Sequence, residues 1–198
     1  MFVPRFQLIT PVVPTSLLRA LVAAGVDAIQ VRDKSADDRT LIGFALAAVE
    51  AVRPLGALVI VNDRVDIALA AGADGVHLGE HDLPVRTARR LAPGLLVGAT
   101  CRSRDAVVAA REEGASYAGV GPVFPSTTKD GLPDPLGLPG LTAASGVLPV
   151  VAVSGVTAAR VPEVLRAGAH GVAVMAAVSR APDPPAAARE IASALRAA

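Results

Sequence analysis

Two acidic and two basic residues stand at positions where they could bind a hard cation and a phosphorylated ligand. Asp63 and Asp82 each follow a short apolar run, and the QVRDK stretch contains Arg32 and Lys34. A pair of carboxylates without a Cys or His cluster suits Mg²⁺, which takes one or two carboxylates together with phosphate oxygens and water. The alternative is that each aspartate caps the following helix. The neighbouring cations favour the metal.

Arg32, Lys34 and Lys129 are the cations that the sequence offers for a diphosphate group. Arginine binds phosphate through parallel N–H groups, and lysine binds it as a point charge. Asp33 lies between two of these cations and could pair with either of them. The combination with Asp63 and Asp82 favours a phosphorylated substrate over a set of solvated surface charges.

Small and hydroxyl-bearing residues indicate a second phosphate site. Ser126, Thr127 and Thr128 supply hydroxyl and N–H groups. We expect Gly155 to open the next helix, where the missing side chain would let a phosphate approach main-chain N–H groups. A glycine turn alone is a weak signal, because every barrel of parallel strands needs small residues at such points.

Short, continuous apolar runs rich in Val, Ile and Leu recur along the whole chain and alternate with segments of helical spacing, several of which end on Gly. Such runs are typical of parallel strands buried on both faces. Eight strand–helix units favour a closed (β/α)8 TIM barrel, with residues 1–198 as a single domain. A doubly wound open sheet is the alternative, although no glycine-rich phosphate loop follows the first run. The predicted strands are 6–10, 28–31, 58–61, 75–78, 95–99, 117–121, 149–153 and 171–175.

The polar residues named above follow the carboxyl ends of these strands, where barrel enzymes place their active sites. We therefore expect them on one rim, with Asp63 and Asp82 after adjacent strands about 5 Å apart. The irregular segment 124–140 is long enough to be functional or disordered. His77, within a strand, is interpreted as a packed and hydrogen-bonded residue, and Cys101 as a packing residue.

Composition excludes several classes of protein. The net charge of +1 and the 3% aromatic content argue against nucleic-acid binding. No apolar run approaches the ~18 residues of a membrane helix, so no membrane partner is expected. A single cysteine excludes an intramolecular disulfide framework, and a cytoplasmic location is the default. The sequence leaves a homo-oligomer open.

Four motifs together resemble those of thiamine phosphate synthases. QVRDK, VND, DGVHLGEHD and GPVFPSTTKDGLPDPLG occur in the order found in that family, and the resemblance covers nearly the whole chain. It implies a TIM barrel that joins 4-amino-2-methyl-5-(diphosphooxymethyl)pyrimidine to a thiazole phosphate, giving thiamine phosphate and diphosphate with Mg²⁺ as cofactor.

The resemblance also implies roles for individual residues. Asp63 and Asp82 would hold Mg²⁺, and Arg32, Lys34 and Lys129 would act on the departing diphosphate. The thiazole phosphate would lie against Ser126, Thr127, Thr128 and Gly155 and the backbone of Met175 and Ala176. The pyrimidine diphosphate would contact Gln30, Val31, Arg32, Asp33, Lys34, Asn62, Thr100 and Lys129.

This chain departs from the family pattern at several positions. Ser154 replaces the first Gly of a usual Gly-Gly pair, and Ala176 replaces a Ser, so one hydroxyl near the thiazole phosphate is missing. Glu80 replaces a Gln. Arg102 stands where the related thiazole tautomerases carry a catalytic His, which favours a synthase over a tautomerase. A non-catalytic barrel that binds phosphorylated ligands is the third interpretation.

Overall fold

A closed barrel of eight parallel strands forms the centre of the molecule in the computed structural model, which describes residues 2–126, 131 and 133–198. Each strand pairs with the next along the chain, and β8 pairs with β1 to close the barrel. The predicted (β/α)8 barrel is confirmed, and the open doubly wound sheet is wrong. The strands are β1 Phe6–Thr10, β2 Ala28–Val31, β3 Leu58–Asn62, β4 Gly75–Leu78, β5 Leu96–Cys101, β6 Tyr117–Val120, β7 Val150–Val153 and β8 Gly171–Val174.

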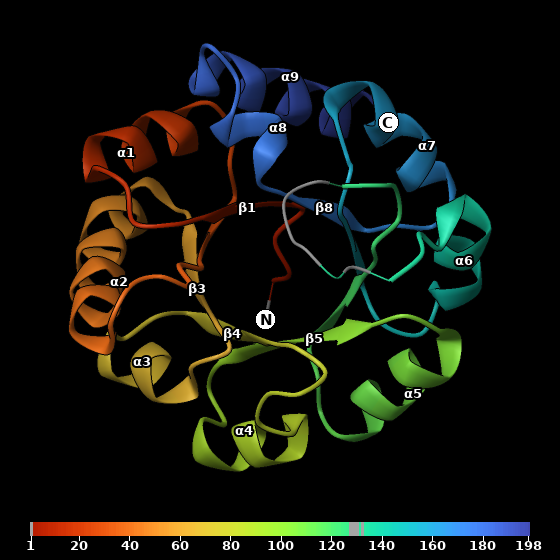
Figure 1. Cartoon of the computed structure of the whole chain (residues 1–198), viewed down its shortest axis with the longest axis horizontal. Coiled ribbons are helices and arrows are strands. Elements are labelled where there is room, and N and C mark those ends of the chain that lie inside the picture. The colour runs from red at the N-terminus through yellow and green to blue at the C-terminus, as the bar shows by residue number, and fades with distance from the viewer. Residues whose placement is uncertain (1, 127–130, 132) are drawn as a thin grey trace.

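Helices follow the strands and form a ring around them (Figure 1). Two features were not predicted from the sequence: a short α8 directly after β8, and 3-10 turns at Arg53–Leu55 and Ala158–Arg160. The helices are α1 Thr15–Ala23, α2 Asp38–Val52, α3 Val65–Ala70, α4 Val85–Leu91, α5 Arg104–Glu112, α6 Gly137–Ala144, α7 Val161–Arg166, α8 Ala176–Ser179 and α9 Pro184–Ala197. Among the described residues, no helix combines the length and apolar character needed to cross a membrane.

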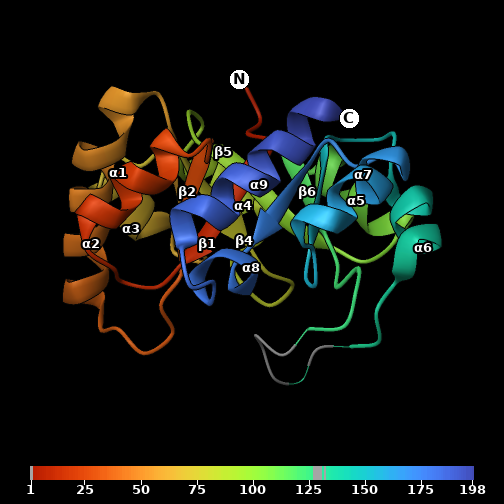
Figure 2. The same cartoon turned by 90° about the horizontal axis from the view of Figure 1, so that it is seen from above.

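The two ends of the barrel differ. Parallel strands bring all their carboxyl ends to one end, which we call the mouth. Figure 2 shows the described parts of the segment between β6 and α6 projecting beyond the mouth, while the N-terminus lies at the opposite end. The mouth is therefore the end at which the predicted site residues meet.

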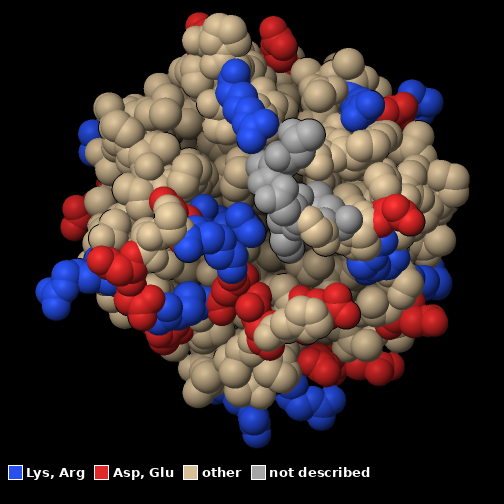
Figure 3. Space-filling view, in the orientation of Figure 1, with Lys and Arg blue, Asp and Glu red and all other residues tan. Residues whose placement is uncertain are grey.

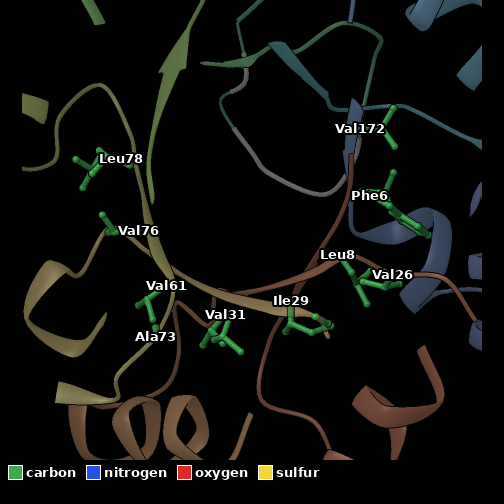
Figure 4. Close-up of a cluster of buried hydrophobic side chains, with 14 of the residues drawn as sticks. Phe6, Leu8, Val26, Ile29, Val31, Val61, Ala73, Val76, Leu78 and Val172 are labelled. Atoms are coloured by element: carbon green, nitrogen blue, oxygen red, sulfur yellow. The ribbon is translucent and has the colours of Figure 1, made fainter. Parts of the chain in front are cut away.

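Two apolar clusters hold the barrel together. The larger one fills the space between strands and helices, and Figure 4 shows Val31, Val61 and Val76 within it. The smaller one lies inside the barrel and includes Ile60 and Leu96. Because side chains alternate between the two faces of a strand, every strand except β4 contributes to both clusters, which explains the continuous apolar sequences.

Candidate active site at the barrel mouth

Asp63 and Asp82 meet at the mouth, as the sequence predicted. Their carboxyl groups share a hydrogen bond, and Lys34 Nζ forms an ion pair with Asp63. Burial raises the pKa of Asp63, but hydrogen bonds from Asp82 and Lys34 outweigh it and hold the pKa below its usual value. Burial and the nearby Asp63 raise the pKa of Asp82. The two neighbouring carboxyl groups therefore shift each other's pKa in opposite directions, down for Asp63 and up for Asp82.

Neither aspartate caps a helix, so that alternative is wrong. The N-cap of α3 is Arg64, and the N-cap of α4 is Pro84. Asp82 instead accepts a hydrogen bond from the Gly79 main-chain N–H at 2.6 Å. Asp63 adopts a left-handed backbone conformation with φ of 66°, and its N–H donates to the His77 carbonyl at 2.8 Å. A residue other than Gly is strained in this conformation, and such strain is concentrated at functional sites.

The donor set of this pair fits Mg²⁺. Two neighbouring carboxylates offer hard oxygen ligands, and a divalent cation between them would offset their mutual repulsion. Across the part of the chain that the structure describes, no group of three or more acidic, His or Cys side chains could hold a metal. A cation bound to Asp63 and Asp82 would therefore complete its coordination with substrate oxygens and water.

Basic side chains border the acidic pair. Figure 3 shows Lys and Arg side chains gathered over the end of β2, with Asp and Glu side chains beside them over β3 and β4. The Lys34 side chain is 62% exposed, so it remains accessible to a ligand while it contacts Asp63. The charge of Arg32 also lowers the pKa of Asp63, which places both predicted cations near the pair.

Two other residues of the QVRDK stretch have mainly structural contacts. The Asp33 carboxylate accepts hydrogen bonds from the Ser35 hydroxyl at 2.6 Å and from the main-chain N–H groups of Val12, Ser35 and Ala36. It thus ties the turn after β2 to the turn after β1. Val31 is fully buried in the cluster between strands and helices, so only its backbone is near the barrel interior.

A polar layer crosses the barrel interior below the mouth. His77 Nδ1 lies 3.0 Å from the Tyr117 hydroxyl, and Nε2 lies 3.1 Å from the Thr100 hydroxyl. Burial lowers the pKa of His77 to about 4, so the imidazole is neutral at pH 7. The interpretation of His77 as a packed, hydrogen-bonded residue is confirmed. Thr100 is exposed although it lies on a barrel strand, because it faces the open mouth.

Glycines make room for the two rings. A Cβ on Gly98 would lie 2.2 Å from the Tyr117 ring, and one on Gly119 would lie 2.7 Å from the His77 ring. Tyr117 also donates to Gln7 Oε1, which lies 3.4 Å away. Neither Gln7 nor Tyr117 was predicted from the sequence to lie beside the candidate site. The available signal was the polar Gln7 inside the apolar run FQLIT, whose neighbours Phe6 and Leu8 are buried.

Arg102, which directly follows β5, forms hydrogen bonds to the segment between β6 and α6. Its guanidinium donates to the Gly121 carbonyl at 3.2 Å and to the Asp134 carbonyl at 2.8 Å. This residue thus joins the two described ends of the segment. Ser126 is the last described residue before the gap, and the predicted site residues Thr127, Thr128 and Lys129 lie outside the described residues.

Gly155 does not open a helix, so that prediction is wrong. The 3-10 turn Ala158–Arg160 begins three residues later, and α7 begins at Val161. Gly155 is required for a different reason: its φ is 69°, and a Cβ there would lie 2.6 Å from Phe124 Cβ. Arg160 reinforces this packing, with its guanidinium 4.3 Å from the centre of the Phe124 ring and a 2.7 Å hydrogen bond to the Gly155 carbonyl.

The remaining predicted residues lie on the same rim. Asn62 ends β3 and is paired in register with His77 on β4. Met175 follows β8, and Ala176 begins α8. Cys101 is 3% exposed, and burial raises the pKa of its thiol to about 11, which confirms its interpretation as a packing residue.

A closed parallel barrel with acidic, basic and polar side chains at its strand ends has the architecture of a TIM-barrel enzyme. The family model described as thiamine monophosphate synthase matches residues 8–178. The chain therefore belongs to the thiamine monophosphate synthase family.

Individual relatives agree with this assignment. The thiamine-phosphate synthase of Methanoculleus marisnigri is 49% identical over 180 residues, which cover 89% of this chain and 85% of that protein. The thiamine-phosphate synthase of Chloroflexus aurantiacus is 43% identical over 178 residues, which cover 89% of this chain and 82% of that protein. The structure of thiamine phosphate pyrophosphorylase from Pyrococcus furiosus superposes with a TM-score of 0.88 at 34% identity, covering 97% of this chain and 96% of that one.

Proposed function

We propose that this chain is a thiamine-phosphate synthase that joins 4-amino-2-methyl-5-(diphosphooxymethyl)pyrimidine to thiazole phosphate and releases diphosphate. The observation that carries the proposal is the contact of Lys34 with the Asp63–Asp82 pair at the mouth. It brings cationic and metal-binding groups together, as a departing diphosphate requires. Membership of the synthase family supports the same reaction.

The proposed chemistry needs no covalent nucleophile from the protein. The C–O bond between the pyrimidine methylene and the diphosphate breaks, and the amino group of the ring stabilises the cation left at that carbon. The thiazole nitrogen then attacks the same carbon and forms the C–N bond. The protein has to stabilise the leaving group, align the two rings and exclude water.

The residues at the mouth divide these tasks in our proposal. Arg32, Lys34 and Lys129 bind the diphosphate and offset its growing charge. Asp63 and Asp82 would hold Mg²⁺, which would supply further positive charge to the leaving group. Gln30, Asn62 and Thr100 would bind the rest of the pyrimidine substrate, together with Asp33 and the backbone of Val31.

The thiazole phosphate would lie at the ends of β7 and β8. Ser126, Thr127, Thr128 and Gly155 would surround it, with the backbone of Met175 and Ala176. Since Ala176 has no hydroxyl, main-chain N–H groups would carry more of this contact than in relatives with a serine. Single-domain behaviour over residues 1–198, a cytoplasmic location and a possible homo-oligomer stay predictions.

The proposal is tested by incubating the purified chain with both substrates and measuring thiamine phosphate and diphosphate. Equal amounts of the two products are expected with Mg²⁺, and none with excess chelator. Thiazole isomerisation without the pyrimidine substrate would instead support a tautomerase. That alternative is disfavoured because Arg102 occupies the position of the tautomerase histidine and its guanidinium is bound to two carbonyls.

A further inference from the structure

Gln7 lies in the middle of the polar layer and is fully buried. Its Oε1 accepts hydrogen bonds from the Tyr117 hydroxyl and from Gln30 Nε2, each at 3.4 Å. In this arrangement the carboxamide oxygen faces both donors. The Nε2 atom is therefore turned away from both partners.

Among the described residues, Gln7 Nε2 is the buried side-chain polar atom that has no hydrogen-bond partner. An unpaired buried amide typically costs about 1–3 kcal/mol. Such groups are rare in folded proteins and call for a specific explanation. A ligand that supplies an acceptor would remove this cost when it binds.

A cavity of about 30 Å³ adjoins Gln7 and is lined also by Gln30, His77 and Tyr117, together with small and apolar residues of β1, β6, β7 and β8. Three of its lining residues, Ile9, His77 and Val153, are partly exposed, so the cavity communicates with the mouth. Its volume suits one edge of a heteroaromatic ring and not a whole substrate. Gly119 lines the same cavity, and its missing side chain makes room there for the His77 ring.

We propose that Gln7 is a specificity-determining residue whose Nε2 donates a hydrogen bond to an acceptor nitrogen on the edge of the pyrimidine ring. This inference rests on the proposed function, because it names a residue that would recognise the pyrimidine ring of one of the two proposed substrates. It also explains why a barrel interior keeps a buried glutamine where an apolar side chain would pack without an unpaired donor.

The test uses the pyrimidine diphosphate and two pyridine analogues, each with one ring nitrogen replaced by CH. Binding is measured by calorimetry with the whole chain. The analogue that lacks the nitrogen contacted by Gln7 should bind the unmodified protein about threefold to tenfold more weakly than the pyrimidine diphosphate does. This is the effect expected for the loss of one hydrogen bond. In Gln7→Met this difference should disappear, while KM for the thiazole phosphate stays unchanged.

Ile9→Val is the matched control, because it enlarges the same cavity without removing a polar group. It should keep the full discrimination against the analogue. Gln7→Asn provides a second variant that retains a carboxamide but is too short to reach, and it should behave like Gln7→Met. Thermal melting checks that each variant is folded.

Equal discrimination by the unmodified protein and both Gln7 variants would overturn the inference, as would equal binding of all three ligands to the unmodified protein. In the second case the cavity would hold water only. Either result leaves the proposed function intact if thiamine phosphate is still formed. Absence of product from the unmodified protein would refute the proposed function instead.

Discussion

The carboxyl groups of Asp63 and Asp82 hydrogen-bond to each other, although they follow different strands and are 19 positions apart in the chain. Lys34, from a third strand end, pairs with one of them. Three neighbouring turns thus build one charged centre.

Asp82→Asn should abolish most activity without harming the fold. The amide keeps an acceptor for the Gly79 N–H but removes a hard anionic ligand. We expect turnover to fall on the order of 100-fold or more, as when one charge-stabilising group is removed from an active site. The melting temperature without metal should be unchanged or higher, because the carboxylate repulsion is gone. Asp66→Asn, which alters the Arg64 ion pair outside the proposed site, is the control.

Lys129→Ala should lower kcat more than it raises KM for the pyrimidine diphosphate. Negative charge on the departing diphosphate is greatest in the transition state, so a cation that follows it acts mainly on kcat. Steady-state kinetics with saturating thiazole phosphate measure both parameters. A change in KM alone would make Lys129 an anchor for the bound substrate only.

Ala176→Ser should leave KM for the thiazole phosphate unchanged or lower it. The new hydroxyl could donate to a charged phosphate, a bond worth roughly 1.5–3 kcal/mol where it forms. KM for the pyrimidine diphosphate should not change. A raised KM for the thiazole phosphate would show that this phosphate binds elsewhere or that the site has no room for a hydroxyl.

Gly155→Val should disturb two features of the mouth at once. Any side chain at Gly155 would meet Phe124, so the variant would displace the segment after β6 as well as obstruct a phosphate. We expect reduced thermal stability together with impaired binding of the thiazole phosphate. Normal affinity for that ligand in a direct titration would exclude a phosphate site beside Gly155.

Arg102→Ala should loosen the segment between β6 and α6. The guanidinium loses its bonds to the Gly121 and Asp134 carbonyls, so the described ends of the segment are no longer joined. Limited proteolysis should cut the variant faster within 124–136, and kcat/KM should fall for both substrates. Arg104→Ala, which removes a comparable bond to the Ser145 carbonyl, should leave the cleavage rate unchanged.

The stabilising effect of Asp33 should depend on pH. Its hydrogen bonds to Ser35 and to main-chain N–H groups lower its pKa below the usual 3.8. A lowered folded-state pKa means that the stabilisation is present above the unfolded pKa and is lost as pH falls through the folded pKa. Asp33→Ala should therefore melt lower than the unmodified chain at pH 7, and the two melting temperatures should converge only as the pH falls well below 3.8. A constant difference down to pH 2 would contradict this origin of the stabilisation.

The sequence alone predicted the fold, which the structure confirms, and it placed the candidate site residues at the strand ends. Eight continuous apolar runs predicted the strands to within about two residues. A strand buried on both faces needs apolar side chains at successive positions, so it is recognisable from the local sequence. The ends of these runs placed Asp63, Asp82 and Lys34 directly after predicted strands. Parallel strands bring their carboxyl ends together at one end of the barrel. These inferences need only local sequence and chain order.

Only the tertiary structure decided which partners the individual side chains contact. The contact of Asp63 with Asp82, the structural bonds of Asp33 and the unpaired Nε2 of Gln7 depend on distances between residues far apart in the sequence. The structure also gives a different reason for a glycine at position 155: a side chain there would collide with Phe124, whereas the sequence predicted that Gly155 opens a helix. Such contacts follow from the register and curvature of the closed barrel, which place residues of different strands within hydrogen-bonding or packing distance and which no local pattern encodes.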